Sequence, residues 1–517
     1  MKVTKQNAAK LGLMAAIMVI FGNVVGIGIF FKNKGVFAKN DSNPYGVLFA
    51  WIASAILVLF IALSFVEICS GKSKNKTTGL GGWAENFCGH QLGRWTKIGY
   101  PIVYFMIQTF TCVFFAGEAI INIVSSCQGS SGSLDFGNLT TLYIMIAGLG
   151  LLAVFTILNW KASKVCSQLG QKLSLFKFLP ILLVIILGIA FGIASTQCGL
   201  WTGHQWGESQ IQNKPINIMG IIMSVPGILF AFEGYLVIGS ISGEIDNAEK
   251  NVPLSMVFAI LLISAVNIAI TVGCITCGTG NVFELMEIVF NNVGNKDLWI
   301  KVSSTVFSCF IFVCIIGVVN GMSFGGIRAL QSACEENLLF KSQKIRNMKP
   351  NDPLFAGFTY YVFFMLLLIL GCGIPSIILN TDNIIDGLSE ANVTAFYLIY
   401  GLVILGGFIN RFTKKIETTK IKGFIFFSFL GALGAITIFC FISFYSNGWQ
   451  AFFEKSDTDS SWGLFQTVGL KLKNWQAGIV FWVFIIYIFG LPFINDLLIK
   501  HSKEYKQNQV RLIWQRA

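Results

Sequence analysis

Three glycines interrupt the first apolar stretch of the chain, where residues 22–30 read G-N-V-V-G-I-G-I-F. Glycine is a poor helix former, so we expect the backbone to unwind here and to free N–H and C=O groups for a ligand. Lipid cannot satisfy such groups, so the interruption must face protein or a water-filled cavity. A similar interruption falls at residues 224–234, S-V-P-G-I-L-F-A-F-E-G. Two interrupted helices in corresponding halves of a chain are typical of a binding site at the membrane midplane.

Three ionisable residues lie deep in apolar stretches, where each costs several kcal/mol unless it is paired or hydrated. They are Glu67, Lys177 and Glu233. Glu67 lies near the end of its stretch, which favours a structural pairing role. Lys177 is either a group that changes charge or a permanently charged tether. For Glu233 three roles stay open: attraction of a cationic substrate, titration, or pairing with a neighbour.

Residue patterns for enzymatic chemistry are missing from the sequence. It contains no readable Ser/His/Asp set, pair of catalytic carboxylates, phosphate-binding loop or dinucleotide fingerprint. Cys274 and Cys277 form a C-x-x-C inside an apolar stretch, but no second pair and no histidine accompany them, so they are weak evidence for a metal. We therefore expect no catalytic residues, no metal and no cofactor.

The composition indicates a membrane protein. Hydrophobic residues make up 54% and charged residues 12% of the chain, and the mean hydropathy is +0.70. A soluble globular chain carries about twice that charged fraction. Runs of roughly 20 apolar residues predict transmembrane helices. There are twelve such runs, near residues 11–31, 46–69, 98–124, 141–159, 174–195, 217–240, 254–277, 301–334, 354–379, 391–410, 423–445 and 477–499.

The positive charges lie between the apolar runs and do not gather on one face, which argues against nucleic acid as a partner despite a net charge of +12. Lys and Arg are concentrated in alternate loops, which predicts cytoplasmic N- and C-termini. The first apolar run is too long for a cleaved signal peptide. We therefore expect a multi-pass protein of the plasma membrane, surrounded by the lipid bilayer.

Short motifs follow one another in a fixed order after the first interruption. They are A-W at 50–51, A-L-S-F-V-E at 62–67, G-G-W at 81–83, L-F-K-F-L-P at 175–180, F-A-F-E-G at 230–234 and R-A-L at 328–330. In this order and spacing they resemble the motifs of the amino acid/polyamine/organocation permeases. The resemblance covers about residues 10–410.

The resemblance implies an all-α integral membrane protein of twelve transmembrane helices with the LeuT-like fold. Helices 1 to 5 and helices 6 to 10 would form two inverted repeats, at residues 11–195 and 217–410, and helices 1 and 6 would be broken. Helices 11 and 12, at residues 423–499, would be peripheral. Residues 1–10 and 500–517 would be cytoplasmic tails.

The resemblance also implies an amino acid substrate. An amino acid brings one carboxylate and one ammonium into a low-dielectric space, where neither can stay unpaired cheaply. The N–H groups of Ile27 and Gly28, at the positive start of a half-helix, would hold the carboxylate. Carbonyls of Val24, Phe230 and Glu233 would take the ammonium, and the Phe230 ring would gate the pocket from outside.

Further residues receive roles from the same resemblance. Gly26 would belong to the same backbone site. Selectivity for the substrate side chain would come from Gln108 and Cys112, one turn apart on helix 3, and from Met322 on helix 8. Lys177 resembles a lysine that fills the place of a sodium ion in proton-coupled or sodium-independent members, so it would be the coupling residue.

Taken together, these features predict a secondary active transporter that moves amino acids by alternating access, through proton coupling or exchange. The carboxylate of Glu233 makes cationic amino acids a candidate substrate class. The alternatives are a transporter of polyamines or other organic cations, and a non-transporting amino acid sensor with the same fold.

Overall fold

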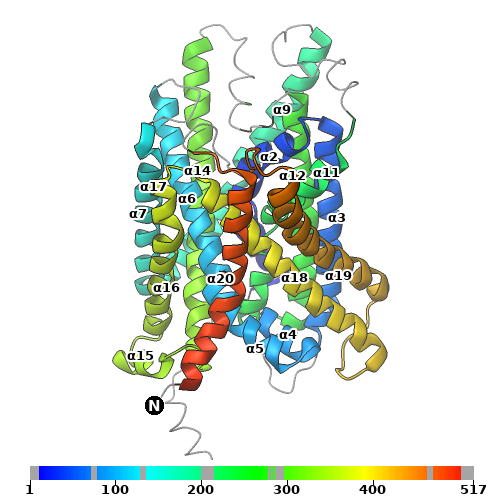
Figure 1. The fold of residues 1–517 in the computed structure, drawn as a ribbon, viewed down its shortest axis with the longest axis vertical. Helices are drawn as coiled ribbons and strands as arrows, with labels where there is room; N and C mark the ends of the chain where they lie inside the picture. Colours follow the sequence, from blue (N-terminus) through cyan, green and yellow to red (C-terminus); the bar gives the residue numbers. More distant parts are fainter. Residues whose placement is uncertain are drawn as a thin grey trace, which may run out of the picture.

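The computed structural model describes residues 11–71, 79–128, 136–198, 215–277, 296–462 and 470–501, together with 280, 282 and 285. These residues form a bundle of helices, most of which run along the long axis of the molecule (Figure 1). The predicted cytoplasmic tails, 1–10 and most of 500–517, lie outside the described residues.

The first part of the chain supplies the helices that carry the first glycine-rich interruption. Their bounds are α1 Leu13–Val24, α2 Ile27–Lys39, α3 Pro44–Cys69, α4 Gly79–Cys88, α5 His90–Gly99, the π-helical turn η1 Tyr100–Tyr104, α6 Phe105–Gln128, the 3₁₀ turn η2 Gly137–Leu139, α7 Thr140–Lys161, α8 Ser163–Phe176 and α9 Phe178–Cys198.

The second part supplies the second interruption and the C-terminal helices. Their bounds are α11 Ile218–Phe230, the 3₁₀ helix η3 Tyr235–Glu244, α12 Ala248–Thr276, α14 Lys296–Glu335, α15 Ser342–Met348, α16 Phe355–Leu368, the π turn η4 Ile369–Gly373, α17 Ile374–Ile378, α18 Asn383–Thr413, α19 Phe424–Cys440 with its π-helical continuation η5 Phe441–Glu454, and α20 Asn474–His501.

The two ends of the bundle differ in the elements they carry. The short helices α4, α5 and α15 lie at one end, which we call the α15 end (Figure 1). Helices α2 and α11 lie toward the opposite end, together with the start of α18 and of α20.

Among the described residues, ten helices are long and apolar enough to cross a membrane, and the bent pair of α1 and α2 raises the number to eleven. The predicted span at 174–195 corresponds to α9, whose apolar part is shorter, Phe178–Ala190. An all-helical membrane-spanning fold is thereby supported, while the number of twelve spans stays a prediction.

Several described helices run past the predicted span boundaries, and two of these differences concern the site. The span predicted to end near residue 31 is followed by helix as far as Lys39, and the span predicted to begin at residue 391 starts at Asn383. Apolar runs end where charges appear in the sequence, whereas a helix continues through a charge that finds a partner. The added turns carry Lys32, Asp386 and Glu390, which are buried in ion pairs.

Helices α6 and α7 pack backbone against backbone at two glycines. A Cβ atom on Gly117 would lie 1.9 Å from the carbonyl oxygen of Ile144, and one on Gly148 would lie 2.2 Å from the carbonyl oxygen of Val113. Small residues at such contacts let membrane helices approach closely and gain dispersion contacts. This approach holds α6, which lines the interior of the bundle, in its position.

We expect Gly148→Ala to lower the free energy of unfolding by about 1–3 kcal/mol, because the added methyl group overpacks the contact with Val113. The apparent melting temperature of the purified protein in detergent measures the effect. Gly150→Ala is the matched control, since a Cβ at Gly150 meets nothing within 4 Å and alanine is the better helix former. Equal losses of stability in both variants would contradict this packing.

Candidate functional site

The first interruption separates α1 from α2. Helix α1 ends at Val24, and Val25 is extended, with φ −76° and ψ 127°. Gly26 follows with φ +152°, a conformation that favours glycine, and α2 begins at Ile27. The two helices are bent by 50° relative to one another. The last carbonyls of α1 and the first N–H groups of α2 therefore lack partners within their own helices.

The second interruption follows α11. This helix ends at Phe230, and the chain tightens into turns in which the N–H groups of Ala231, Phe232 and Glu233 each donate to the carbonyl three residues earlier. Gly234 has φ +104°, and the 3₁₀ helix η3 begins directly after it. The chain direction thus changes at a position that a residue with a side chain rarely adopts.

The two interruptions touch one another. A Cβ atom on Gly28 would lie 2.2 Å from the Cα atom of Ala231, so the start of α2 packs directly on the backbone that follows α11. A Cβ atom on Gly234 would lie 3.6 Å from Cγ2 of Val24 and 3.2 Å from Cε of Met322. The structure therefore brings Val24, Gly28 and Met322 close to the two interruptions.

Lys177 lies between α8 and α9 and is fully buried. Its Nζ donates hydrogen bonds to the carbonyls of Gly22, at 2.5 Å, and Val25, at 2.9 Å. These carbonyls belong to the end of α1, where the helix dipole favours a positive charge. Room for the side chain comes from Gly317, on which a Cβ atom would lie 3.1 Å from Cε of Lys177. The ammonium thus satisfies the backbone that the interruption exposes.

Glu233 lies in an aromatic environment and is buried. Tyr104 donates a hydrogen bond from its hydroxyl to Glu233 Oε2 at 2.5 Å. The ring of Tyr104 stacks on Tyr100 at a centroid distance of 4.6 Å, while Tyr397 and Tyr400 pack together at 5.2 Å. All of these tyrosines are buried. The carboxyl group of Glu233 therefore reaches the interior beside a cluster of packed tyrosine rings.

The remaining predicted site residues are buried but differ in how closely they approach the interruptions. Phe230 is packed against Phe115 at a centroid distance of 6.0 Å. The thiol of Cys112 is an ionisable neighbour of Lys177. Gln108 is buried, and its Oε1 finds no hydrogen-bond partner among the described residues. The structure does not describe the side chain of Ile27.

The structural pairing role predicted for Glu67 is confirmed. Arg411 Nη1 donates to both of its carboxylate oxygens, at 2.9 and 3.1 Å. The hydroxyl of Thr418 and the backbone N–H of Ile421 donate to the same carboxylate at 3.2 and 3.0 Å. With its lone pairs occupied in this way, Glu67 joins α3 to the segment that follows α18.

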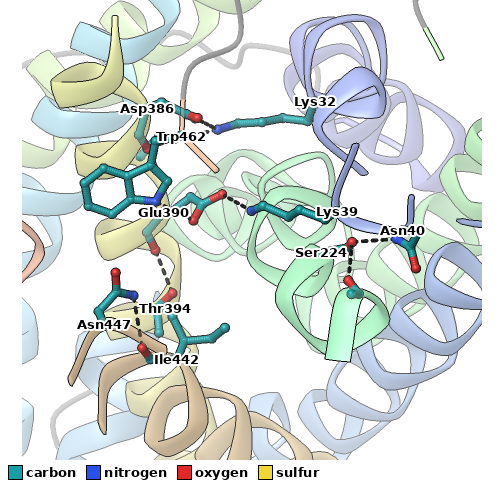
Figure 2. Close-up of polar contacts among 12 residues, drawn as sticks. Lys32, Lys39, Asn40, Ser224, Asp386, Glu390, Thr394, Ile442, Asn447 and Trp462 are labelled. Atoms are coloured by element: carbon teal, nitrogen blue, oxygen red, sulfur yellow. Dashed lines mark hydrogen bonds and ion pairs between the residues drawn. The ribbon is translucent and has the colours of Figure 1, made fainter. Parts of the chain in front are cut away.

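Two buried ion pairs between α2 and α18 escaped the sequence analysis. Lys32 pairs with Asp386, and Lys39 Nζ lies 3.0 Å from Glu390 Oε1 (Figure 2). Trp462 donates from its indole nitrogen to Glu390 Oε2 at 3.1 Å. The pairs close the molecule between these two helices at the end opposite α15.

A spacing signal for these pairs was present in the sequence. Asp386 and Glu390 lie one helical turn apart, and Lys32 and Lys39 lie two turns apart, so each pair of like charges falls on one face of its helix. Lys32 also places its ammonium 5.0 Å from the centroid of the Phe230 ring. The ion pairs between α2 and α18 therefore lie next to Phe230, the residue that was expected to gate the pocket.

The chemistry available here is binding. Exposed helix ends, a buried ammonium and a buried carboxylate can together pair both charges of a small zwitterion. Within the described parts of the chain, no three His, Cys, Asp or Glu side chains lie close enough to hold a metal ion.

Comparisons with known proteins agree with this geometry. The model of the family described as amino acid permease matches residues 11–491. The serine/threonine exchanger SteT of Bacillus subtilis is 26% identical over 80% of this chain and 86% of its own length. The b(0,+)-type amino acid transporter 1 of Mus musculus is 23% identical over 80% of this chain and 78% of its own length.

Among solved structures, MhsT in complex with L-phenylalanine superposes with a TM-score of 0.51 at 12% identity, covering 82% of this chain and 96% of MhsT. At this identity the likeness is one of fold. The relatives are transporters and not enzymes. The match of the family model to nearly the whole chain shows that this protein is a multi-pass membrane protein that belongs to the amino acid permease family.

Proposed function

We propose that this protein is a secondary active transporter that moves amino acids across the plasma membrane by alternating access. The substrate would bind where the two helix interruptions meet. The direct contact of Gly28 with the backbone of Ala231 carries this proposal, because it brings two sets of free helix ends together in the interior. The two five-helix repeats would move relative to one another around this place.

The zwitterionic part of the substrate would be bound mainly by backbone groups. The N–H groups of Ile27 and Gly28 start α2, where the helix dipole favours a carboxylate. The carbonyls of Val24 and Phe230 end α1 and α11, and that of Glu233 lies in the turns after α11; we propose that all three accept from the ammonium. Binding through the backbone suits a site that must take several amino acids, because it leaves side-chain selectivity to other residues.

The α15 end would face the cytoplasm. This end is positively charged, because it carries Lys161 at the end of α7, Lys344 within α15, and Lys341 and Lys349 on either side of α15. Concentration of Lys and Arg on the cytoplasmic side is the usual determinant of topology. The opposite end, closed by the pairs of α2 with α18, would then face outward.

Lys177 would make sodium unnecessary for transport. Its ammonium already occupies the carbonyls of Gly22 and Val25, which a bound cation would otherwise coordinate. A serine/threonine exchanger and an aspartate-proton symporter, the latter 24% identical over 46% of this chain, are among the similar proteins. Both names are compatible with the exchange or proton coupling that we propose.

Glu233 would favour cationic side chains. Two unit charges about 4 Å apart interact by roughly 4 kcal/mol at an effective dielectric constant of 20, before desolvation is subtracted. Lysine, arginine and ornithine are therefore the proposed preferred substrates.

We expect Gly28→Val to abolish amino acid binding, because its side chain would occupy the space of Ala231 and block the N–H groups of α2. Uptake of a panel of labelled amino acids into proteoliposomes, with and without proton and sodium gradients, measures the loss. Gly35→Val in the same helix is the control, since a Cβ at Gly35 meets nothing within 4 Å. Normal uptake by Gly28→Val would refute the backbone site.

For coupling, we expect uptake at the same rate when sodium is replaced by choline. Lys177→Met should bind substrate but stop net transport, because the carbonyls of Gly22 and Val25 lose their donor. Binding by equilibrium dialysis and uptake are measured in parallel, with the exposed Lys172→Met as the control. A requirement for a sodium gradient would show that Lys177 has been assigned the wrong role.

For selectivity, we expect Glu233→Gln to weaken competition by lysine, arginine and ornithine about tenfold or more, because a fixed charge opposite the substrate is lost. Competition by leucine and alanine should change far less, so these amino acids are the internal control. The inhibition of uptake of one labelled substrate by each unlabelled amino acid gives the order of their affinities. An unchanged order would indicate a carrier of neutral amino acids in which Glu233 faces away from the substrate.

A further inference from the structure

The segment between η5 and α20 places a tryptophan against α18, at the end of the bundle opposite α15. We call its described residues, 455–462 and 470–473, the connecting segment. The indole ring of Trp462 lies on the backbone of Gly387, on which a Cβ atom would come within 2.4 Å of the ring. One turn further along α18, Glu390 Oε2 accepts a hydrogen bond from the indole nitrogen at 3.1 Å. The ring therefore fits here because residue 387 has no side chain.

The connecting segment is fastened to the start of α20. The N–H of Ser460 donates to the carbonyl of Leu472 at 2.8 Å, and the N–H of Asn474 donates to the carbonyl of Thr458 at 2.9 Å. These hydrogen bonds pair the stretch that carries Trp462 with the residues that lead into α20. The position of the indole is therefore tied to that of α20.

Helix α20 is itself anchored at two levels. The indole nitrogen of Trp482 donates to the carbonyl of Asn447 in η5 at 3.2 Å. Nearer the α15 end, Asp496 accepts from Arg94 of α5 at 2.7 Å. Trp462 is thus held by η5 and α20, the helices that the resemblance made peripheral.

The carboxylate of Glu390 is shared between two elements. Its Oε1 pairs with Lys39 of α2 at 3.0 Å, and its Oε2 accepts from Trp462 (Figure 2). The Glu390 side chain is only 7% exposed, so water has little access to replace the indole while α2 and α18 are joined. If α2 moved away from α18, water would reach the carboxylate and satisfy Oε2. A buried acceptor that loses its donor costs more than a hydrated one, so this hydrogen bond stabilises the closed arrangement more than an open one.

We propose that Trp462 is a positioning residue for the outer closure, by which we mean the ion pairs Lys32–Asp386 and Lys39–Glu390. The indole holds the carboxylate of Glu390 with Oε1 directed at Lys39, and its ring keeps water from the pair, which strengthens the attraction. Helices η5 and α20 thereby take part in controlling access to the site between the interruptions. The inference rests on the proposed function only where it says that the outer closure controls the access of a substrate.

The test is hydrogen–deuterium exchange of the full-length protein in lipid nanodiscs, read by mass spectrometry. The first N–H groups of α2 and of α18 have no acceptor within their own helix, so they exchange when water enters between the two helices. Trp462→Phe keeps a ring and removes the donor. We expect these amides to exchange about ten- to a hundredfold faster, because a buried hydrogen bond to a charged group is lost, while α4 and α5 at the α15 end stay unchanged. Gly387→Ala should give the same pattern, since its methyl group displaces the indole without changing a charge.

Trp449→Phe is the matched control. The indole nitrogen of Trp449 also donates to a carboxylate, Glu454 Oε1 at 2.9 Å, but Trp449 is 53% exposed, so water can replace it. Unchanged exchange at the starts of α2 and α18 in Trp462→Phe, or an equal rise in Trp449→Phe, would overturn the proposal. So would a rise confined to the connecting segment, or one that extends to α4 and α5 in both Trp462→Phe and Gly387→Ala.

Uptake of labelled amino acids into proteoliposomes, measured on the same preparations, separates this inference from the proposed function. A wild type that transports no amino acid would overturn the proposed function. The exchange rates need no substrate, so they decide the role of Trp462 in the outer closure by themselves.

Discussion

The hydrogen bonds from Lys177 to the carbonyls of Gly22 and Val25 are the interaction on which the rest of the site depends. A helix that stops inside an apolar bundle leaves backbone groups that neither lipid nor its own turns can satisfy. The buried ammonium resolves this problem for the carbonyls at the end of α1. The N–H groups at the start of α2 are then left available for a ligand.

The same requirement explains why charges lie inside this apolar protein. Each described buried charge discussed above has a partner from a segment distant in the sequence: Glu67 has Arg411, Lys32 has Asp386, and Lys39 has Glu390. Removing one member of such a pair leaves the other uncompensated, which costs more than the pair contributes. The main effect of these pairs is therefore to fix the relative positions of the helices that they join, and not to raise the free energy of unfolding. Where a pair joins two helices, it also sets the resistance to their separation.

The start of α2 lies at the proposed substrate site, and its end lies at the ion pairs with α18. At its start, Gly28 packs on Ala231 and allows no side chain. At its end, Lys39 forms an ion pair with Glu390 of α18. A movement of this single helix would change both places at once. In a close-packed interior such a movement proceeds between discrete arrangements, as alternating access requires.

The sequence by itself determined the helical membrane fold and the positions of both interruptions, because apolar length and glycine act locally. It also picked out Glu67, Lys177 and Glu233 as buried ionisable residues. It could not find the pairs of α2 with α18, since hydropathy ends a span at a charge and the partner of Lys32 lies 354 residues away. Only the tertiary structure decided that Lys32, Lys39, Asp386 and Glu390 are also buried, because burial of a charge near the end of a span depends on a partner that folding brings within reach.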